Sequence, residues 1–224
     1  MKKTILFCAY RDWAVAVYQN VVSKYQLEYD IYLVESPIEL AQILRDGLKP
    51  ETIICVGWSW FIPISVVKEF QVIGVHPSDL PEYAGGSPIQ HQISDGLITT
   101  KNTLFRLNEI MDSGPILCQV NLSLAGDLNQ VHNNLTITST ELITFYLSEN
   151  YSEGHFRLNI PQNIKKRLTE KDGELDKAKL LVKTTLDLYN FMRCRESPYP
   201  NAFIEDEFGK LYFEKVRYVP KKEV

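Results

Sequence analysis

Short apolar runs alternate with amphipathic stretches through the first third of the chain, and this alternation constrains the fold more than any other feature. Four runs have the length and composition of buried strands, at residues 3–10, 29–34, 52–56 and 72–75. The stretches between them repeat apolar side chains at helical spacing, at residues 12–25, 36–47 and 66–70. Short strand–helix–strand connections place successive strands in parallel. The pattern therefore predicts an α/β fold with a doubly wound, mostly parallel sheet.

The rest of the chain continues this core and then changes character. We expect a helix at 88–93, strands at 102–107 and 116–122, and a closing helix at 127–147. Asp12 and Asp127 are the expected caps of the first and last core helices. From about residue 150 the sequence becomes polar and predicts an exposed, solvated connector. One helix at 180–194 and a hairpin at 202–205 and 210–216 follow. We predict a core domain at 1–150 and a small extension, a linker helix and a β-hairpin, at 151–224.

Composition excludes several classes of protein. The formal net charge of −4 disfavours a nucleic-acid partner. No apolar run approaches the roughly 20 residues of a membrane span, and the N-terminal run stops at Arg11 without a cleavage site. The four cysteines are widely spaced, and no His or Cys cluster has the spacing of a metal site. We expect a cytoplasmic protein that binds no membrane, no nucleic acid and no metal.

Polar residues follow the predicted strands where ligands bind in such sheets, at the carboxyl ends. His76 closes an apolar strand and precedes a loop stiffened by prolines and glycines, and Asp112 lies in a glycine-containing turn between two later strands. Taken alone, His76 is better explained as a structural histidine, and Asp112 as a turn aspartate. Together they form an acid–base pair of the kind used in proton transfer. The first strand–helix turn lacks GxGxxG, which disfavours a dinucleotide site.

Two motifs carry a resemblance to a known family. The pattern H-P-x-x-L-P-x-Y-x-G-x-x-P-I spans His76 to Ile89, and M-D-x-G-P-I-L spans Met111 to Leu117. In order and separation they resemble the signature of the folate-dependent formyltransferases. Residues 56–63 resemble the family's loop after the third strand, and segments between residues 167 and 203 resemble the linker of its longer members.

The resemblance implies that 10-formyltetrahydrofolate donates a formyl group to an amine without a metal. His76 would accept a proton from the attacking nitrogen or, as a cation, stabilise the oxyanion, and Asp112 would orient the imidazole and relay the proton. The folate would contact the loop after the third strand and the Asp112 turn, at Trp58, Ser59, Phe61, Ile62, Pro63 and Met111.

Gly74 departs from the family pattern, in which an asparagine two residues before the histidine bonds the formyl oxygen. Losing an oxyanion donor costs about 10²- to 10³-fold in rate. We expect compensation, and the candidate donors are Asn108, protonated His76 and backbone amides in the loop at 58–62.

The acceptor expected from the size of the chain and its short tail is a nucleotide-linked amino sugar. Methionyl-tRNA and glycinamide ribonucleotide are the alternative acceptors, and a non-catalytic folate- or nucleotide-binding relative is the alternative from another class. We expect substrate contacts from the first strand end and from the loop after His76, at Tyr10, Arg11, Trp13, Ser78, Gly85 and Gly86. Aromatic residues of the C-terminal unit suggest a homodimer contact there.

Overall fold

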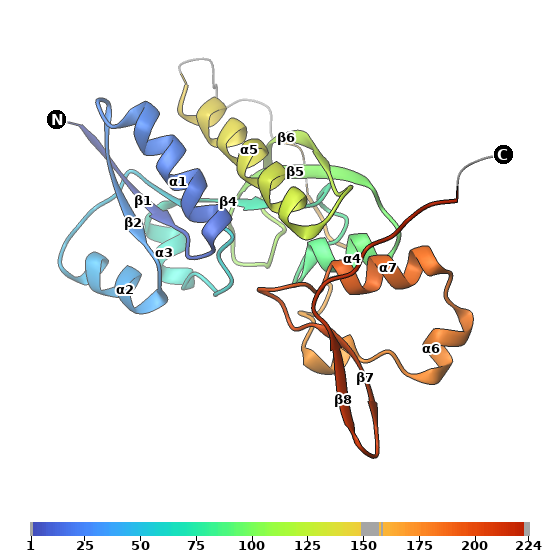
Figure 1. The fold of residues 1–224 in the computed structure, drawn as a ribbon. Helices are drawn as coiled ribbons and strands as arrows, with labels where there is room; N and C mark the ends of the chain where they lie inside the picture. Colours follow the sequence, from blue (N-terminus) through green and yellow to red (C-terminus); the bar gives the residue numbers. More distant parts are fainter. Residues whose placement is uncertain (1, 149–156, 158, 222–224) are drawn as a thin grey trace.

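A single six-stranded sheet forms the centre of the computed structural model, which describes residues 2–148, 157 and 159–221 (Figure 1). Its strands are β1 (Lys3–Cys8), β2 (Tyr29–Val34), β3 (Thr52–Val56), β4 (Gln71–His76), β5 (Thr99–Arg106) and β6 (Ile116–Ser123). They lie in the order β2-β1-β3-β4-β5-β6. The first four pair in parallel, and β5 and β6 run antiparallel to their neighbours. The predicted α/β fold with a mostly parallel sheet is confirmed.

The strand order reverses at β1, and this reversal positions the site. The chain passes from β1 outward to β2 and then adds β3 on the opposite side of β1. In a doubly wound sheet such a reversal opens a crevice at the carboxyl ends of the strands. The crevice is bordered by the loops after β1 and β3, and β4, the next strand in the sheet, ends at His76.

Helices cover both faces of the sheet because alternate strand residues point to opposite sides. The core helices are α1 (Asp12–Tyr25), α2 (Pro37–Arg45), α3 (Ile64–Glu69), α4 (Pro88–Ser94) and α5 (Leu128–Leu147). On one face α1 and α5 lie side by side over Ile5 and Phe7 (Figure 1). On the other face, Leu40 of α2 packs with Leu6 and Ile53. Among the described residues, no helix has both the length and the apolar character needed to cross a bilayer.

The helix starts follow local capping chemistry, with one correction. The carboxylate of Asp127 accepts from the amide of Gln130 at 2.9 Å, within a complete capping box, as the sequence predicted. The prediction that Asp12 caps α1 is wrong, because Arg11 occupies the N-cap and Asp12 is the first helical residue. There its negative charge faces the positive end of the helix dipole.

The C-terminal extension consists of η1 (Glu170–Gly173), α6 (Lys177–Val182), α7 (Thr185–Arg193), β7 (Ala202–Asp206) and β8 (Gly209–Phe213). The hairpin is confirmed, but the single helix predicted at 180–194 is wrong. Thr184 is extended and forms a capping box with Asp187, so a new helix begins there. Arg193 ties α7 to the core by donating to the carbonyls of Leu124 and Gly126. The predicted division at 150/151 falls outside the described residues.

Candidate functional site

The carboxyl end of β4 delivers His76 into a tightly bonded loop. Its side chain is almost entirely buried, with 7% of the residue exposed. Ser78, which we expected to contact substrate, is fully buried. Its amide donates to the His76 carbonyl at 2.9 Å, and its hydroxyl donates to the Glu82 carbonyl at 2.6 Å. Ser78 therefore shapes the loop that holds His76.

Asp112 lies in the turn that joins β5 to β6. The Asn108 carboxamide oxygen accepts from the Ile110 amide at 2.9 Å and the Ser113 hydroxyl at 3.0 Å, which closes this turn. Asp112 adopts a φ of 49°, in the left-handed region that non-glycine residues rarely occupy. Strain of this kind persists only where surrounding contacts enforce it. Asn108, one of the expected oxyanion donors, is therefore part of the Asp112 turn and holds it closed.

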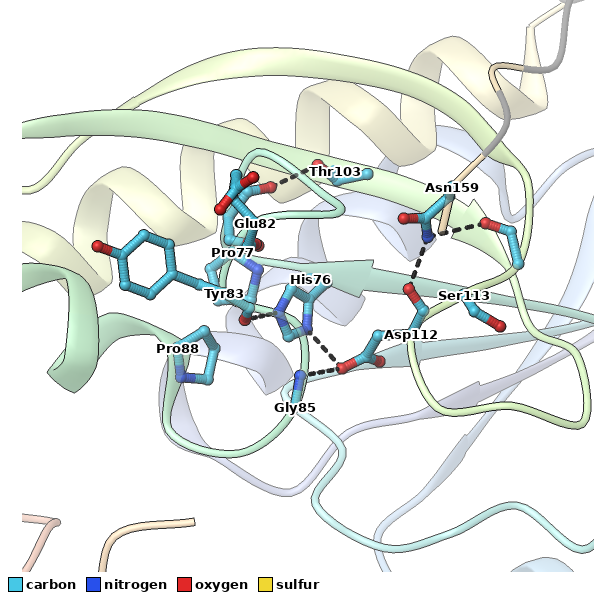
Figure 2. Close-up of polar contacts among 12 residues, drawn as sticks. His76, Pro77, Glu82, Tyr83, Gly85, Pro88, Thr103, Asp112, Ser113 and Asn159 are labelled. Carbon is cyan, nitrogen blue, oxygen red and sulfur yellow. Dashed lines mark hydrogen bonds and ion pairs between the residues drawn. The ribbon is translucent and has the colours of Figure 1, made fainter. Parts of the chain in front are cut away.

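His76 lies between two acceptors, one at each ring nitrogen (Figure 2). Its Nε2 is 3.0 Å from the carbonyl oxygen of Tyr83, and its Nδ1 is 3.5 Å from Oδ2 of Asp112. The same carboxylate oxygen accepts from the amide of Gly85 at 2.7 Å. A carbonyl and a carboxylate cannot donate, so both contacts are satisfied together when the ring carries a proton on each nitrogen. The geometry fits an imidazolium–carboxylate pair.

The two glycines after Tyr83 bring a later segment against the pair. Gly85 has a φ of 106°, and a Cβ there would lie 2.3 Å from the Lys165 carbonyl oxygen. A Cβ on Gly86 would lie 2.5 Å from the backbone of Arg167. The amide of Gly86 donates to Lys165, and the amide of Lys165 donates to Ala84, each at 2.8 Å. The two glycines therefore allow a second backbone segment to approach the loop that follows His76.

Gly74 is enclosed by apolar side chains. A Cβ at this position would lie 2.8 Å from Cδ1 of Leu107 and 3.1 Å from Cε1 of Phe105. Phe105 also meets the His76 ring edge-on, with the ring centroids 6.5 Å apart. The volume that a side chain at Gly74 would need is therefore filled from β5 and the loop after it.

Aromatic residues and one arginine gather at the adjoining ends of β1 and β3. The hydroxyl of Tyr10 donates to the hydroxyl of Ser59 at 2.7 Å, and its ring centroid lies 4.4 Å from that of Trp60 and 6.4 Å from that of Trp58. The guanidinium of Arg11 lies 5.1 Å from the centroid of the Tyr10 ring. The structure therefore brings together two of the expected folate contacts, Trp58 and Ser59, and two of the expected substrate contacts, Tyr10 and Arg11, at the strand reversal.

Trp13 lies beside this cluster and packs against Gly57, the first residue after β3. A Cβ on Gly57 would be 2.9 Å from the Trp13 ring, and the Gly57 φ of 59° suits glycine. The ring of His132, from α5, stacks on Trp13. Burial and the positive charge of Arg11 lower the pKa of His132 to about 4. The ring is therefore neutral at physiological pH.

The remaining expected folate contacts differ in exposure. Phe61 is 80% exposed, Met111 is 38% exposed, Ile62 is half-buried, and Pro63 is the N-cap of α3. Trp60 and Tyr199 were not predicted as site residues. Trp60 had a signal, since it follows the same strand end as Trp58. Tyr199, over which the Arg11 guanidinium also lies at 5.1 Å, comes from the distant C-terminal unit and had none.

A sequence profile of the formyl transferase family matches residues 19–139, more than half of the chain. The protein belongs to this family. Methionyl-tRNA formyltransferase of Lactobacillus gasseri is 24% identical over 197 residues, which cover 84% of this chain and 62% of that protein. The chain spans less than two thirds of the length of the first curated relatives that it matches.

Solved structures share the fold. A methionyl-tRNA formyltransferase from Clostridium thermocellum superimposes with a TM-score of 0.83 at 21% identity, covering 98% of this chain and 94% of that one. A sugar N-formyltransferase from Shewanella has a TM-score of 0.72 at 17% identity, covering 98% and 99%. HypX from Aquifex aeolicus, in complex with tetrahydrofolic acid, has a TM-score of 0.70 at 19% identity, covering 90% and 35%.

Proposed function

We propose that this protein is an N-formyltransferase that moves a formyl group from 10-formyltetrahydrofolate to the amine of an acceptor. The observation that carries the proposal is the His76–Asp112 pair at the carboxyl edge of a sheet in a member of the formyl transferase family. The tetrahydrofolic acid complex of HypX, which has the same fold, supports a folate donor. The folate would bind along the loop at 58–63 and against Met111.

In the proposed reaction the neutral amine attacks the formyl carbon, and the new C–N bond produces a tetrahedral oxyanion. A His76 cation would stabilise this charge, which the acceptors at both ring nitrogens favour over a role as the base. Asp112 would take the proton from the attacking nitrogen and pass it to N10 of the folate as the C–N10 bond breaks. The pair would then return to its starting state.

The surroundings of Gly74 support His76 as the group that replaces the missing asparagine. Leu107 and Phe105 fill the space beside Gly74 and offer no hydrogen-bond donor there. Asn108, the other side-chain candidate, uses its oxygen to close the Asp112 turn, which leaves its NH₂ group as the donor it could present. Both ring nitrogens of His76 face acceptors, so a His76 cation would act on the oxyanion through its charge and not through a free N–H group.

Methionyl-tRNA is the acceptor that similarity favours. The Lactobacillus gasseri relative carries that name, and the Clostridium thermocellum enzyme superimposes better than the sugar enzyme, with TM-scores of 0.83 and 0.72. This ranking differs from the sugar acceptor expected from sequence. A nucleotide-linked amino sugar is the second candidate, because the net charge of −4 is unfavourable for a polyanion and the Tyr10–Trp60 cluster offers flat faces for a base.

The test is direct. The protein is incubated with 10-formyltetrahydrofolate and either methionyl-tRNA or a panel of nucleotide-linked amino-dideoxy sugars, and formylated product is measured by mass spectrometry. His76→Gln is expected to lose at least about 100-fold in rate while still binding a folate analogue in calorimetry. Binding without turnover of any acceptor by the wild-type protein would favour a non-catalytic relative. Wild-type rates in His76→Gln would refute the catalytic assignment.

We also propose that the C-terminal unit joins two copies of the chain. The hairpin β7–β8 exposes apolar side chains, with 90% of Phe208 and 59% of Leu211 accessible. Sedimentation velocity tests this, and a monomer at all accessible concentrations contradicts it.

A further inference from the structure

We propose that Asn159 is a positioning residue that sets the backbone of the Asp112 turn and thereby aims the carboxylate at His76. The inference rests on the proposed function and adds to it a residue from outside the two motifs. Asn159 lies in the segment after the core that was expected to be an exposed polar connector. Instead the residue is only 2% exposed.

The amide group of Asn159 holds the Asp112 turn by two hydrogen bonds. Its Nδ2 donates to the Asp112 carbonyl at 2.6 Å and to the Gly114 carbonyl at 3.1 Å (Figure 2). Both partners are carbonyl oxygens, so the NH₂ end of the side chain must face them. The two bonds bracket Ser113 and hold the carbonyls on either side of it.

This turn needs such support because its backbone is strained. Asp112 has a φ of 49°. The turn is also closely packed, since a Cβ on Gly114 would lie 1.6 Å from the Arg106 carbonyl oxygen. Without the Asn159 bonds, the buried Gly114 carbonyl and the partly buried Asp112 carbonyl would lose this donor, and the turn could relax toward a more common conformation. Because Asp112 leaves the backbone at this strained residue, a small rotation there moves its carboxylate relative to His76.

The same segment is also hydrogen-bonded to the strand after the Asp112 turn and to the loop after His76. Arg157 exchanges two backbone hydrogen bonds with Ile116, and Lys165 bonds Ala84 and Gly86 beside the loop that follows His76. Gly85, in that loop, donates to the Asp112 carboxylate. Asp112 is therefore held at two points. Asn159 bonds its backbone carbonyl, and its carboxylate accepts from Gly85, in a loop that Lys165 holds by backbone hydrogen bonds.

Three substitutions grade the loss of donors. Asn159→Asp keeps the shape but replaces the NH₂ donors with an acceptor that faces two carbonyls. Asn159→Ala removes the group, and Asn159→Ser retains one donor. Asn163→Asp is the matched control, because it makes the same chemical change at an exposed position in the same segment.

Two quantities are measured: the kinetics of formyl transfer and the 15N signals of the His76 ring. The expected result for Asn159→Asp is a kcat reduced about 10- to 100-fold, with the KM for 10-formyltetrahydrofolate changed by less than about 3-fold. Asn159→Ser is expected to fall between the wild type and Asn159→Ala. In protein labelled with 15N-histidine, the ring signals of His76, identified with His76→Gln, are expected to shift, while the signals of the other histidines do not change.

Some outcomes overturn the proposal. Folded Asn159 variants with wild-type kcat and unchanged His76 signals would do so, as would an equal effect of Asn163→Asp. If Asn159→Asp does not fold, the alanine and serine variants decide. If the wild-type protein formylates no acceptor, the proposed function fails, but the 15N signals of His76 still report whether Asn159 positions the pair.

Discussion

At the scale of single residues, the groups that surround His76 say more about its role than the presence of a histidine at this position does. A strand-end histidine near an aspartate is common, but here a backbone carbonyl faces Nε2 and a carboxylate faces Nδ1. The sequence predicted that the two side chains would meet. It carried no sign of the Tyr83 carbonyl, because a backbone acceptor has no signature in the residue that provides it.

Gly74 gives the first prediction at this scale. Gly74→Asn is expected to lower the free energy of unfolding by about 1–3 kcal/mol, because the added side chain collides with Leu107 and Phe105. Adding Leu107→Ala to Gly74→Asn is expected to recover part of that loss, because it removes the atom nearest to the new Cβ. Urea denaturation of the wild type, both single variants and the double variant gives the coupling energy. Additive effects of the two substitutions, or a Gly74→Asn protein as stable as the wild type, would contradict the argument that the new side chain is crowded.

His132 gives the second. Its pKa is about 4 in the folded protein and near 6.5 when unfolded, so below pH 6.5 the unfolded chain binds a proton that the native state does not. The free energy of unfolding therefore decreases as pH falls from about 6.5 to about 4, by at most about 1.4 kcal/mol per pH unit from this group. His132→Phe keeps a ring against Trp13 and removes the titration.

Urea denaturation of both proteins at several pH values measures this contribution. Between about pH 7 and about pH 5 the wild-type protein is expected to lose more stability than His132→Phe. Parallel pH profiles for the two proteins would show that the buried ring does not titrate as inferred.

At the scale of elements, capping decides where helices begin. The sequence predicted the Asp127 cap but joined α6 and α7, because apolar residues continue at helical spacing across Lys183 and Thr184. The structure shows that the Thr184 side chain and Asp187 form a reciprocal capping box, which starts α7 with its own axis. Periodicity alone does not reveal a local hydrogen bond that interrupts it.

This cap gives the third prediction. Thr184→Ala is expected to lower the free energy of unfolding by about 1 kcal/mol, because an amide at the start of α7 loses its acceptor. The neighbouring Thr185→Ala, at an exposed helical position, is the matched control and is expected to stay within about 0.5 kcal/mol. Equal losses in the two variants, measured by chemical denaturation, would argue against the capping box as the cause.

At the scale of the whole molecule, the site draws on three distant parts of the chain. The motif after β4 supplies His76, the turn after β5 supplies Asp112, and the segment from Arg157 to Arg167 bonds the loops that carry both. That segment also reaches the aromatic cluster, since the Arg167 guanidinium donates to the Ser59 carbonyl at 3.2 Å. The expected solvated connector is therefore part of the site's framework through its backbone and through Asn159.

The sequence by itself determined the α/β architecture, most element positions, the strand ends that bear polar residues and the meeting of His76 with Asp112. These depend on hydrophobic periodicity and on turn residues, which are local and readable. Only the tertiary structure decided what fills the space at Gly74, which acceptor faces each nitrogen of His76, and that Asn159 supports the Asp112 turn. Those contacts join backbone groups and side chains far apart in the chain, so no local pattern specifies them.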